Sequence, residues 1–332
     1  MPKVSVILPV YNGAAYIHEA VTSVLAQSFS DFDLFVIDDG STDNTLDVLQ
    51  QINDKRLKIT PNDANVGLIN TLNRGLNLSA GYKYVARMDA DDICLPGRLA
   101  ATVNVLDSHP AIGVAGTSVT YFGEGLKNKD VILPATNERI VPALMCRNPI
   151  IHPSVMIRNE VLLNNNLQYD SDYYKYEDYK LWLDLINKCE FYNTHEIHFM
   201  YRRHSNNVTN VGNYNIADDL DMMNQILTNY ANALQFEFTP REIYIITIIA
   251  STYRWRADTT LPLGDIIANI RAIIDKHSYK NIDSKYLTEL LWERVFIYLL
   301  KTKRLTDFLT LIVKLGTTIN YNHIMRIYNN WY

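Results

Sequence analysis

The sequence predicts an α/β fold: a Rossmann-like, mostly parallel sheet followed by a C-terminal all-helical region. Over residues 4–89, short apolar runs alternate with segments whose apolar residues recur at helical spacing, as in strand–helix–strand units. From about residue 213 onward the spacing is helical throughout. The composition agrees, because 332 residues with 48% hydrophobic and 20% charged side chains can build a large soluble core and two domains.

The elements are expected in the following order. Strands are predicted over 4–9, 34–38, 57–60 and 84–89, with helices over 14–28, 43–52 and 66–79 between them. Residues 97–210 are mixed, with helices near 97–108 and 177–188 and extended segments near 112–121, 152–158 and 197–203. Further helices are expected over 215–234, 240–257, 262–276, 284–303, 305–315 and 320–331. We place the boundary so that the first domain covers residues 1–212 and the helical domain residues 213–332.

Polar, acidic or aromatic residues follow three of the predicted strands. Tyr11 and Asn12 come after the first, Asp38-Asp39 after the second, and Asp89-Ala90-Asp91-Asp92 after the fourth. In open parallel sheets ligands bind at the carboxyl ends of the strands, near the topological switch point. We therefore expect these side chains to converge on one site.

The three aspartates after the fourth strand repel one another. Two carboxylates ~5 Å apart at an effective dielectric constant near 20 cost roughly 3 kcal/mol. They are either solvated turn residues, one of which caps the next helix, or ligands of a divalent cation such as Mn²⁺ or Mg²⁺. The D-x-D spacing alone does not decide between these interpretations.

Several classes of function are disfavoured. The net charge of −5 argues against nucleic acid as a partner. Three widely separated cysteines predict neither a disulfide nor a zinc framework and fit the cytoplasm. The apolar run after Met1 reads as a strand, and no stretch approaches the ~20 apolar residues of a membrane span. The glycine-rich loops of dinucleotide-binding and P-loop proteins are absent.

Seven motifs together carry a family resemblance: SVILPVYNG, VIDDGSTDNT, NVGLINTLNRGL, ARMDADD, HPSVMIR, YEDYKLWLDL and YRRHSNNVT. In their order and approximate spacing they resemble family-2 glycosyltransferases with the GT-A nucleotide-sugar-binding fold, over about residues 1–210. The resemblance implies an inverting enzyme that depends on Mn²⁺ or Mg²⁺ and uses a UDP-sugar. It divides the first domain into a nucleotide-sugar half, about 1–110, and an acceptor half, about 111–212.

The resemblance also implies roles for single residues. Those implied to bind the nucleotide sugar are Pro9, Val10, Tyr11, Asp39, Asn65, Gly67, Asp89 and Ala90. Asp39 would accept a hydrogen bond from the uracil ring, and Asp89 would contact the ribose. Asp91, in the DXD motif, would bind the metal, and His204 would reach the metal or the diphosphate. One departure is Leu72, where relatives often carry an arginine, which leaves open any donor contact of that arginine.

Glu177 and Asp178 also have roles implied by the resemblance. By resemblance Asp178 is the catalytic base and Glu177 a supporting or acceptor-orienting residue. The alternative is structural, because acidic residues in a first helical turn are stabilised by the helix dipole. Similar alternatives exist for Tyr11 as a core aromatic, Asp39 as a turn residue and His204 as a surface residue.

Residues 294–332 carry six basic residues against one acid, with interleaved aromatics. Such helices either pack on the catalytic domain or on a second copy of the chain, or lie on an anionic membrane surface. The expected activity is transfer of a hexose or N-acetylhexosamine to a hydroxyl of a glycan or lipid-linked glycan. It would serve cell-surface polysaccharide or lipopolysaccharide biosynthesis, in the cytoplasm or at the inner face of the membrane. The alternative is a catalytically silent module that binds sugar nucleotides or glycans and assembles through its helical domain.

Overall fold

The computed structural model describes residues 2–204, 215–251, 254–277 and 282–315. These residues fall into two compact units. The first unit comprises residues 1–140 and 149–211, and the second comprises residues 141–148 and 212–332. Each unit has its own architecture.

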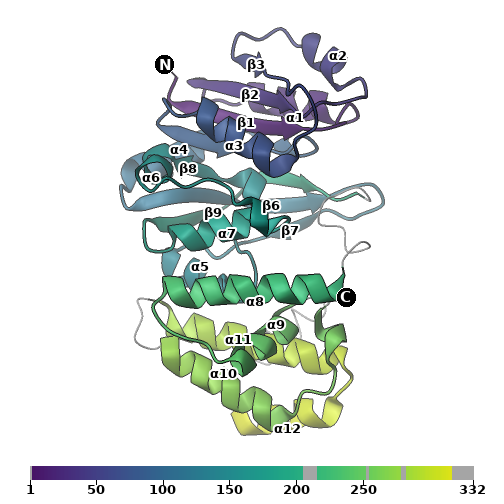
Figure 1. Ribbon diagram of the computed structural model, residues 1–332, viewed down its shortest axis with the longest axis vertical. Helices are drawn as coiled ribbons and strands as arrows, with labels where there is room; N and C mark the ends of the chain where they lie inside the picture. Colours follow the sequence, from purple (N-terminus) through teal and green to yellow (C-terminus); the bar gives the residue numbers. More distant parts are fainter. Residues whose placement is uncertain (1, 205–214, 252–253, 278–281, 316–332) are drawn as a thin grey trace. The chain divides into compact units, whose positions relative to one another are not determined.

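The first unit is built on a sheet that has nine strands within the described residues, in the order β3-β2-β1-β4-β8-β6-β9-β5, with β7 paired to β6 (Figure 1). The strands are β1 (Val4–Val10), β2 (Phe32–Asp38), β3 (Leu57–Ile59), β4 (Tyr84–Arg87), β5 (Ile93–Cys94), β6 (Ile112–Phe122), β7 (Lys129–Val131), β8 (Met156–Arg158) and β9 (Glu190–Arg202). Strands β3, β2, β1 and β4 are parallel, as are β6 and β9. Strands β5, β7 and β8 join antiparallel. The expected mostly parallel sheet is therefore confirmed.

Helices cover both faces of this sheet. The helices of the first unit are α1 (Ile17–Leu25), α2 (Thr45–Gln50), α3 (Leu68–Leu78), α4 (Arg98–Ser108), α6 (Asn159–Asn164) and α7 (Glu177–Leu185). Helix α5 (Asn137–Ala143) begins in the first unit and ends in the second. Alternate residues of β1, beginning with Val4 and Val6, share one core with Ile17 of α1 and Leu99 of α4. Helix α3 packs on β1 and β2. Because successive strand residues point to opposite faces, a run with every position buried, as in β1, indicates a strand covered on both sides.

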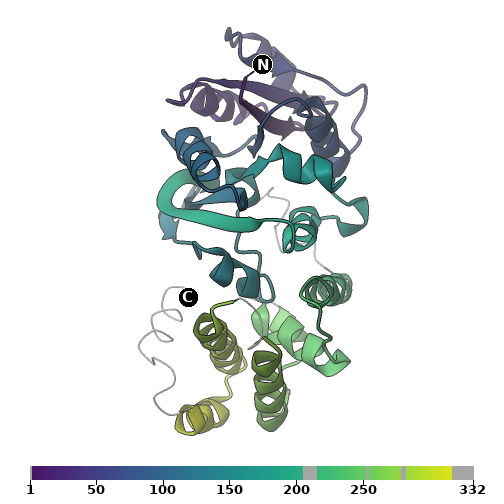
Figure 2. The same ribbon diagram turned by 90° about the vertical axis from the view of Figure 1, so that its left-hand side faces the viewer.

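The second unit is helical, as the sequence predicts. Its long helices are α8 (Ile216–Ala233), α9 (Pro240–Ala250), α10 (Leu263–His277), α11 (Ser284–Lys301) and α12 (Leu305–Leu315). Figures 1 and 2 show them gathered into one all-helical body. Thr239 and Glu242 form a capping box at the start of α9, which satisfies its first N–H groups. Among the described helices, none is long and apolar enough to cross a membrane. The helix predicted over 320–331 lies outside the described residues.

Candidate active site

The strand order places the candidate site at a switch point of the sheet. Chain order runs outward from β1 through β2 to β3, whereas β4 lies on the other side of β1. Tyr11 follows β1 and Asp89 follows β4, so the two residues flank this point. Asp38 pairs in register with Val10, and the Asp39 N–H donates to the Val10 carbonyl at 2.8 Å. The loops after three neighbouring strands therefore meet at one edge, as predicted.

Side chains tie the loops after β1 and β2 together. The Asn12 N–H donates to Ser41 Oγ at 2.8 Å, and Asn12 Oδ1 accepts from the Thr42 N–H at 2.8 Å. The Ala14 N–H donates to Asp43 Oδ2 at 3.1 Å. These bonds join the loop after β1, where Tyr11 leaves the sheet, to the loop after β2.

Asp39 is almost fully buried, and donors from the segment after β3 surround it. Its Oδ1 accepts from the Asn62 side-chain amide at 2.7 Å and from the Val66 N–H at 3.0 Å. Its Oδ2 accepts from the Gly67 N–H at 2.9 Å. Asn65 is exposed, and its own Oδ1 accepts from the same Gly67 N–H at 3.1 Å. Asp39, Asn65 and Gly67, all predicted to bind the nucleotide sugar, thus form one hydrogen-bonded group.

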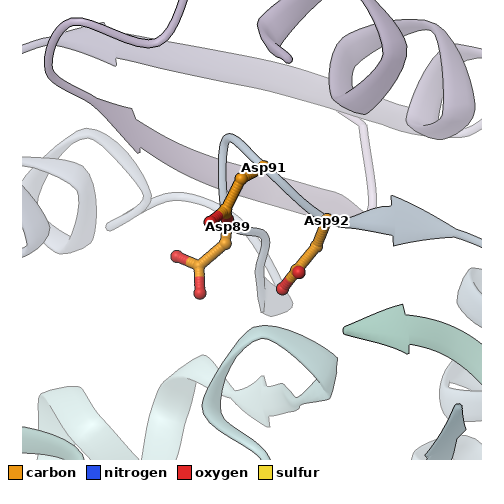
Figure 3. A group of neighbouring side chains, drawn as sticks. All are labelled: Asp89, Asp91 and Asp92. Atoms are coloured by element: carbon orange, nitrogen blue, oxygen red, sulfur yellow. The ribbon is translucent and has the colours of Figure 1, made fainter. Parts of the chain in front are cut away.

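Asp89, Asp91 and Asp92 project from one turn after β4 (Figure 3). A carboxylate oxygen from each lies within 4.8 Å of the others. Arg87, itself buried, forms an ion pair with Asp89. Burial raises the pKa of the Asp89 carboxyl, and the Arg87 charge opposes that shift. Burial, followed by the charges of Asp89 and Asp91, raises the pKa of Asp92 well above its ordinary value. The positive charge near this turn therefore does not fully balance the three carboxylates.

The oxygen atoms of this turn fit a divalent cation. Asp92 is buried, and its Oδ2 has no hydrogen-bond partner within the described parts of the chain. His204 Nε2 lies 2.8 Å from Asp91 Oδ2, which brings together two residues 113 positions apart. Carboxylate oxygens with an imidazole nitrogen form a donor set that suits Mn²⁺, and a cation there would relieve the cost of confining three carboxylates. The turn can therefore hold a metal ion.

Arg202, the last residue of β9, anchors this turn, a role that its sequence context does not indicate. Its backbone N–H donates to Asp92 Oδ1 at 2.7 Å, and its Nε donates to the Asp91 carbonyl at 2.6 Å. The guanidinium lies over the rings of Tyr16 and Phe122, at 4.6 Å and 4.4 Å from their centroids. Such contacts hold a planar cation in place, so the Arg202 side chain is engaged by other groups of the protein.

Helix α7 presents its N-terminus to the same region. Glu177 is buried, and burial raises the pKa of its carboxyl, against the opposing effects of its own N–H group and of the Arg87 charge. The charge of Asp89 also acts on Glu177, so the two carboxyls lie in one field. Asp178 Oδ1 accepts from the Tyr179 N–H at 2.6 Å, at the first turn of the helix. The structure thus brings Glu177 into the electrostatic surroundings of the turn of Asp89, Asp91 and Asp92, and Asp178 follows it in the first turn of α7.

Other predicted residues differ in exposure. Tyr11 is 50% exposed, so its ring is available to stack and is not the core aromatic of the alternative reading. Pro9 and Val10 are buried within β1. Ala90 is half-buried beside the loop after β1. Leu72 is fully buried, so the position where relatives often carry an arginine belongs to the core here.

Comparison with known proteins identifies the family. Residues 5–167 match the family described as Glycosyl transferase family 2. An uncharacterised glycosyltransferase of Haemophilus influenzae is 36% identical over 224 residues, which cover 64% of this chain and 69% of that protein. The chain belongs to glycosyltransferase family 2. A second relative, the amylovoran biosynthesis glycosyltransferase AmsE of Erwinia amylovora, is 30% identical over 187 residues, covering 55% of this chain and 69% of that protein.

Solved structures of other proteins with a similar fold support the same architecture. TarS 1–349 of S. aureus, in complex with UDP-GlcNAc, superposes with a TM-score of 0.62 at 19% identity and covers 96% of this chain and 93% of that chain. The mannosyltransferase PcManGT of Pyrobaculum calidifontis, in complex with GDP-Man and Mn²⁺, superposes with a TM-score of 0.52 at 17% identity, covering 93% and 87%. At these identities the likeness establishes the fold alone, and the GT-A fold expected from the sequence is confirmed.

Proposed function

We propose that this glycosyltransferase is inverting and metal-dependent, and that it transfers a hexose or N-acetylhexosamine from a UDP-sugar to a glycan hydroxyl. The observation that carries the proposal is the turn of Asp89, Asp91 and Asp92, with an unpartnered buried oxygen on Asp92 and His204 against Asp91. A nucleotide diphosphate needs a counter-charge at this position, and a divalent cation held by Asp91 and His204 would supply it. Bound there, the cation would stabilise the negative charge of the diphosphate leaving group.

The remaining chemistry falls to side chains of the protein. Asp178 accepts the proton of the acceptor hydroxyl, and the freed oxygen forms a bond to the anomeric carbon of the sugar. The bond from that carbon to the diphosphate breaks in the same step, and UDP leaves with the electron pair. Glu177 orients the acceptor. One base is enough, because a diphosphate leaves without protonation, unlike the leaving group of a glycoside hydrolase, which a second carboxyl must protonate.

Two features support a UDP-sugar donor and a polysaccharide acceptor. A buried carboxylate such as Asp39, directly after β2, favours a base with a ring N–H, such as uracil or guanine, over cytosine and adenine. TarS was solved with UDP-GlcNAc, and AmsE is named for the biosynthesis of amylovoran. We therefore propose a role in cell-surface polysaccharide or lipopolysaccharide biosynthesis, in the cytoplasm or at the inner face of the membrane.

The test is release of nucleotide from a donor panel by purified protein. We expect slow UDP release from at least one of UDP-Glc, UDP-Gal, UDP-GlcNAc and UDP-GalNAc with Mn²⁺, none with EDTA, and none from GDP-Man. Asp178→Asn should bind UDP as before and lose turnover by ~10² or more, because it removes the base. The matched control is Asp184→Asn, the same change on the same helix, where Asp184 pairs with Lys180.

Two outcomes would contradict the proposal. Wild-type turnover by Asp178→Asn removes that residue from the mechanism. A protein that binds UDP-sugars tightly but never releases UDP, with or without added acceptor glycans, is the silent binding module. An inverted anomeric configuration of the product, read by NMR, would establish the stereochemistry.

We further propose peripheral contact with an anionic membrane through the helical unit. On α12, Leu305, Leu309 and Val313 are spaced by one helical turn and are 63%, 61% and 82% exposed, next to the exposed Lys314. The double variant Leu309→Glu/Val313→Glu should lower co-sedimentation of the full chain with anionic vesicles. The same change at the exposed Leu163 of the first unit should leave it unaltered. Equal vesicle binding by the wild type, the double variant and Leu163→Glu would contradict this part of the proposal.

A further inference from the structure

We infer that Asn62 and Arg74 are positioning residues that set the base selectivity of this glycosyltransferase by orienting Asp39. The inference rests on the proposed function, in which Asp39 meets the nucleotide base. It starts from a count of lone pairs. Each carboxylate oxygen accepts about two hydrogen bonds. Oδ1 of Asp39 accepts two, from Asn62 and Val66, whereas Oδ2 accepts one.

The Asn62 side chain cannot turn over without losing its partners. Arg74 Nη1 donates to Asn62 Oδ1 and to the Pro61 carbonyl, the latter at 2.8 Å. A guanidinium has no acceptor, so the amide oxygen of Asn62 must face Arg74. The amide nitrogen then faces Asp39, and it also donates to the buried Thr71 hydroxyl at 3.0 Å. Arg74 thereby determines which end of the amide Asp39 meets.

This orientation leaves one acceptor site for a ligand. With Oδ1 saturated by Asn62 and Val66, the remaining lone pair of Asp39 is on Oδ2. A base with a ring N–H, such as uracil, can donate to that oxygen. Cytosine presents a lone pair at the same ring position, which a carboxylate repels. Without Asn62, the carboxylate could rotate or offer Oδ1 instead, and the discrimination between the two bases would fall.

The experiment measures base selectivity, which general damage to the fold would not change. Calorimetry with Mn²⁺ gives the ratio of the dissociation constants for CDP and UDP, and the wild type should favour UDP. Asn62→Leu should lower the ratio about tenfold, a change equivalent to about 1.4 kcal/mol. Arg74→Met should lower it about fivefold, and Arg74→Lys, which retains a donor, should restore most of it. Asn104→Leu, at an exposed position on α4, is the matched control and should keep the wild-type ratio.

The outcomes separate this inference from the function on which it rests. If the wild type binds CDP as tightly as UDP, the proposed UDP donor is wrong. If the wild type favours UDP but Asn62→Leu and Arg74→Met both stay within twofold of its ratio, the positioning role is wrong. If Asn62→Leu does not fold, the comparison of Arg74→Met with Arg74→Lys decides.

Discussion

Gly40, directly after Asp39, allows a prediction whose size follows from the backbone. Its φ is +73°, and a Cβ there would lie 2.7 Å from the backbone nitrogen of Asn65 and 2.8 Å from the carbonyl carbon of Ala64. Gly125 has nearly the same φ, +72°, with nothing within 4 Å of a Cβ. Substitution by alanine therefore has the same conformational cost at both glycines, and the two sites differ only in the room available for a Cβ atom.

The magnitudes can be separated. A left-handed conformation costs an L-residue roughly 1–2 kcal/mol, and the lower entropy of the unfolded alanine chain returns about 0.4–1 kcal/mol. Gly125→Ala should thus lose between about 0 and 1.6 kcal/mol. Gly40→Ala adds a collision with backbone atoms, which cannot rotate away, and overpacking of this kind costs typically 1–3 kcal/mol more. The total for Gly40→Ala is about 1–5 kcal/mol, and it exceeds the loss for Gly125→Ala by about 1–3 kcal/mol.

The assay compares both variants by thermal unfolding and by UDP calorimetry. A domain of about 200 residues shifts by roughly 2–4 °C per kcal/mol, so the melting temperature of Gly40→Ala should lie roughly 2–12 °C below that of Gly125→Ala. Because the collision displaces Ala64 and Asn65, which lead into the N–H donors of Asp39, UDP affinity should also drop by more than about fivefold. Equal melting temperatures and equal UDP affinities for the two variants would refute this reasoning.

Three other predictions concern charge. Mn²⁺ at a hundredfold excess over its dissociation constant should stabilise the folded wild type by about 2.7 kcal/mol and leave the stability of Asp91→Ala unchanged. Calorimetric melting measures both, and equal shifts in melting temperature for the two proteins would mean that the ion binds elsewhere. Arg98→Met should cost about 2–4 kcal/mol in denaturant unfolding, because the buried guanidinium donates to two backbone carbonyls; a loss below 1 kcal/mol would contradict this. The hydrogen bond from Arg56 lowers the pKa of Asp54 to about 2, so this pair stabilises the fold above the unfolded pKa near 4 and loses that effect as pH falls toward 2. The stability difference between wild type and Asp54→Asn, below about 1 kcal/mol for a surface pair, should vanish over that range, and a constant difference would count against the assignment.

Periodicity was enough to predict most of the fold. The runs at 4–9 and 34–38 could be predicted as strands because apolar residues covered on both faces leave a nearly continuous apolar signature. The strand predicted at 57–60 is short, and its exposed Lys58 alternates with half-buried Leu57 and Ile59. The helical unit was equally predictable, since amphipathic spacing is local. The long strand β9 (Glu190–Arg202) was expected only near 197–203. Its register against β6 shifts at several points, and such irregularity hides the period of two in the sequence.

Some residues of the candidate site could likewise be predicted from the sequence, and others could not. The aspartates after β2 and β4 could be predicted from the sequence because ligands bind at the carboxyl ends of parallel strands. Asn62 also follows a strand, β3, so the same rule points to it. Arg74 and Arg202 could not be found in this way. Their roles depend on side-chain contacts between segments that lie 12 and 110 residues apart, and no sequence period encodes such contacts.

The anchoring of the acidic turn by Arg202 has a consequence for how the protein matures. The turn is complete as a chain once residue 92 has been synthesised, yet its anchor arrives only with β9, more than a hundred residues later. A nascent polypeptide that has formed its first four strands still lacks the hydrogen bonds that hold Asp91 and Asp92 in place. The cation site proposed for this turn would therefore be complete only after β9 has joined the sheet.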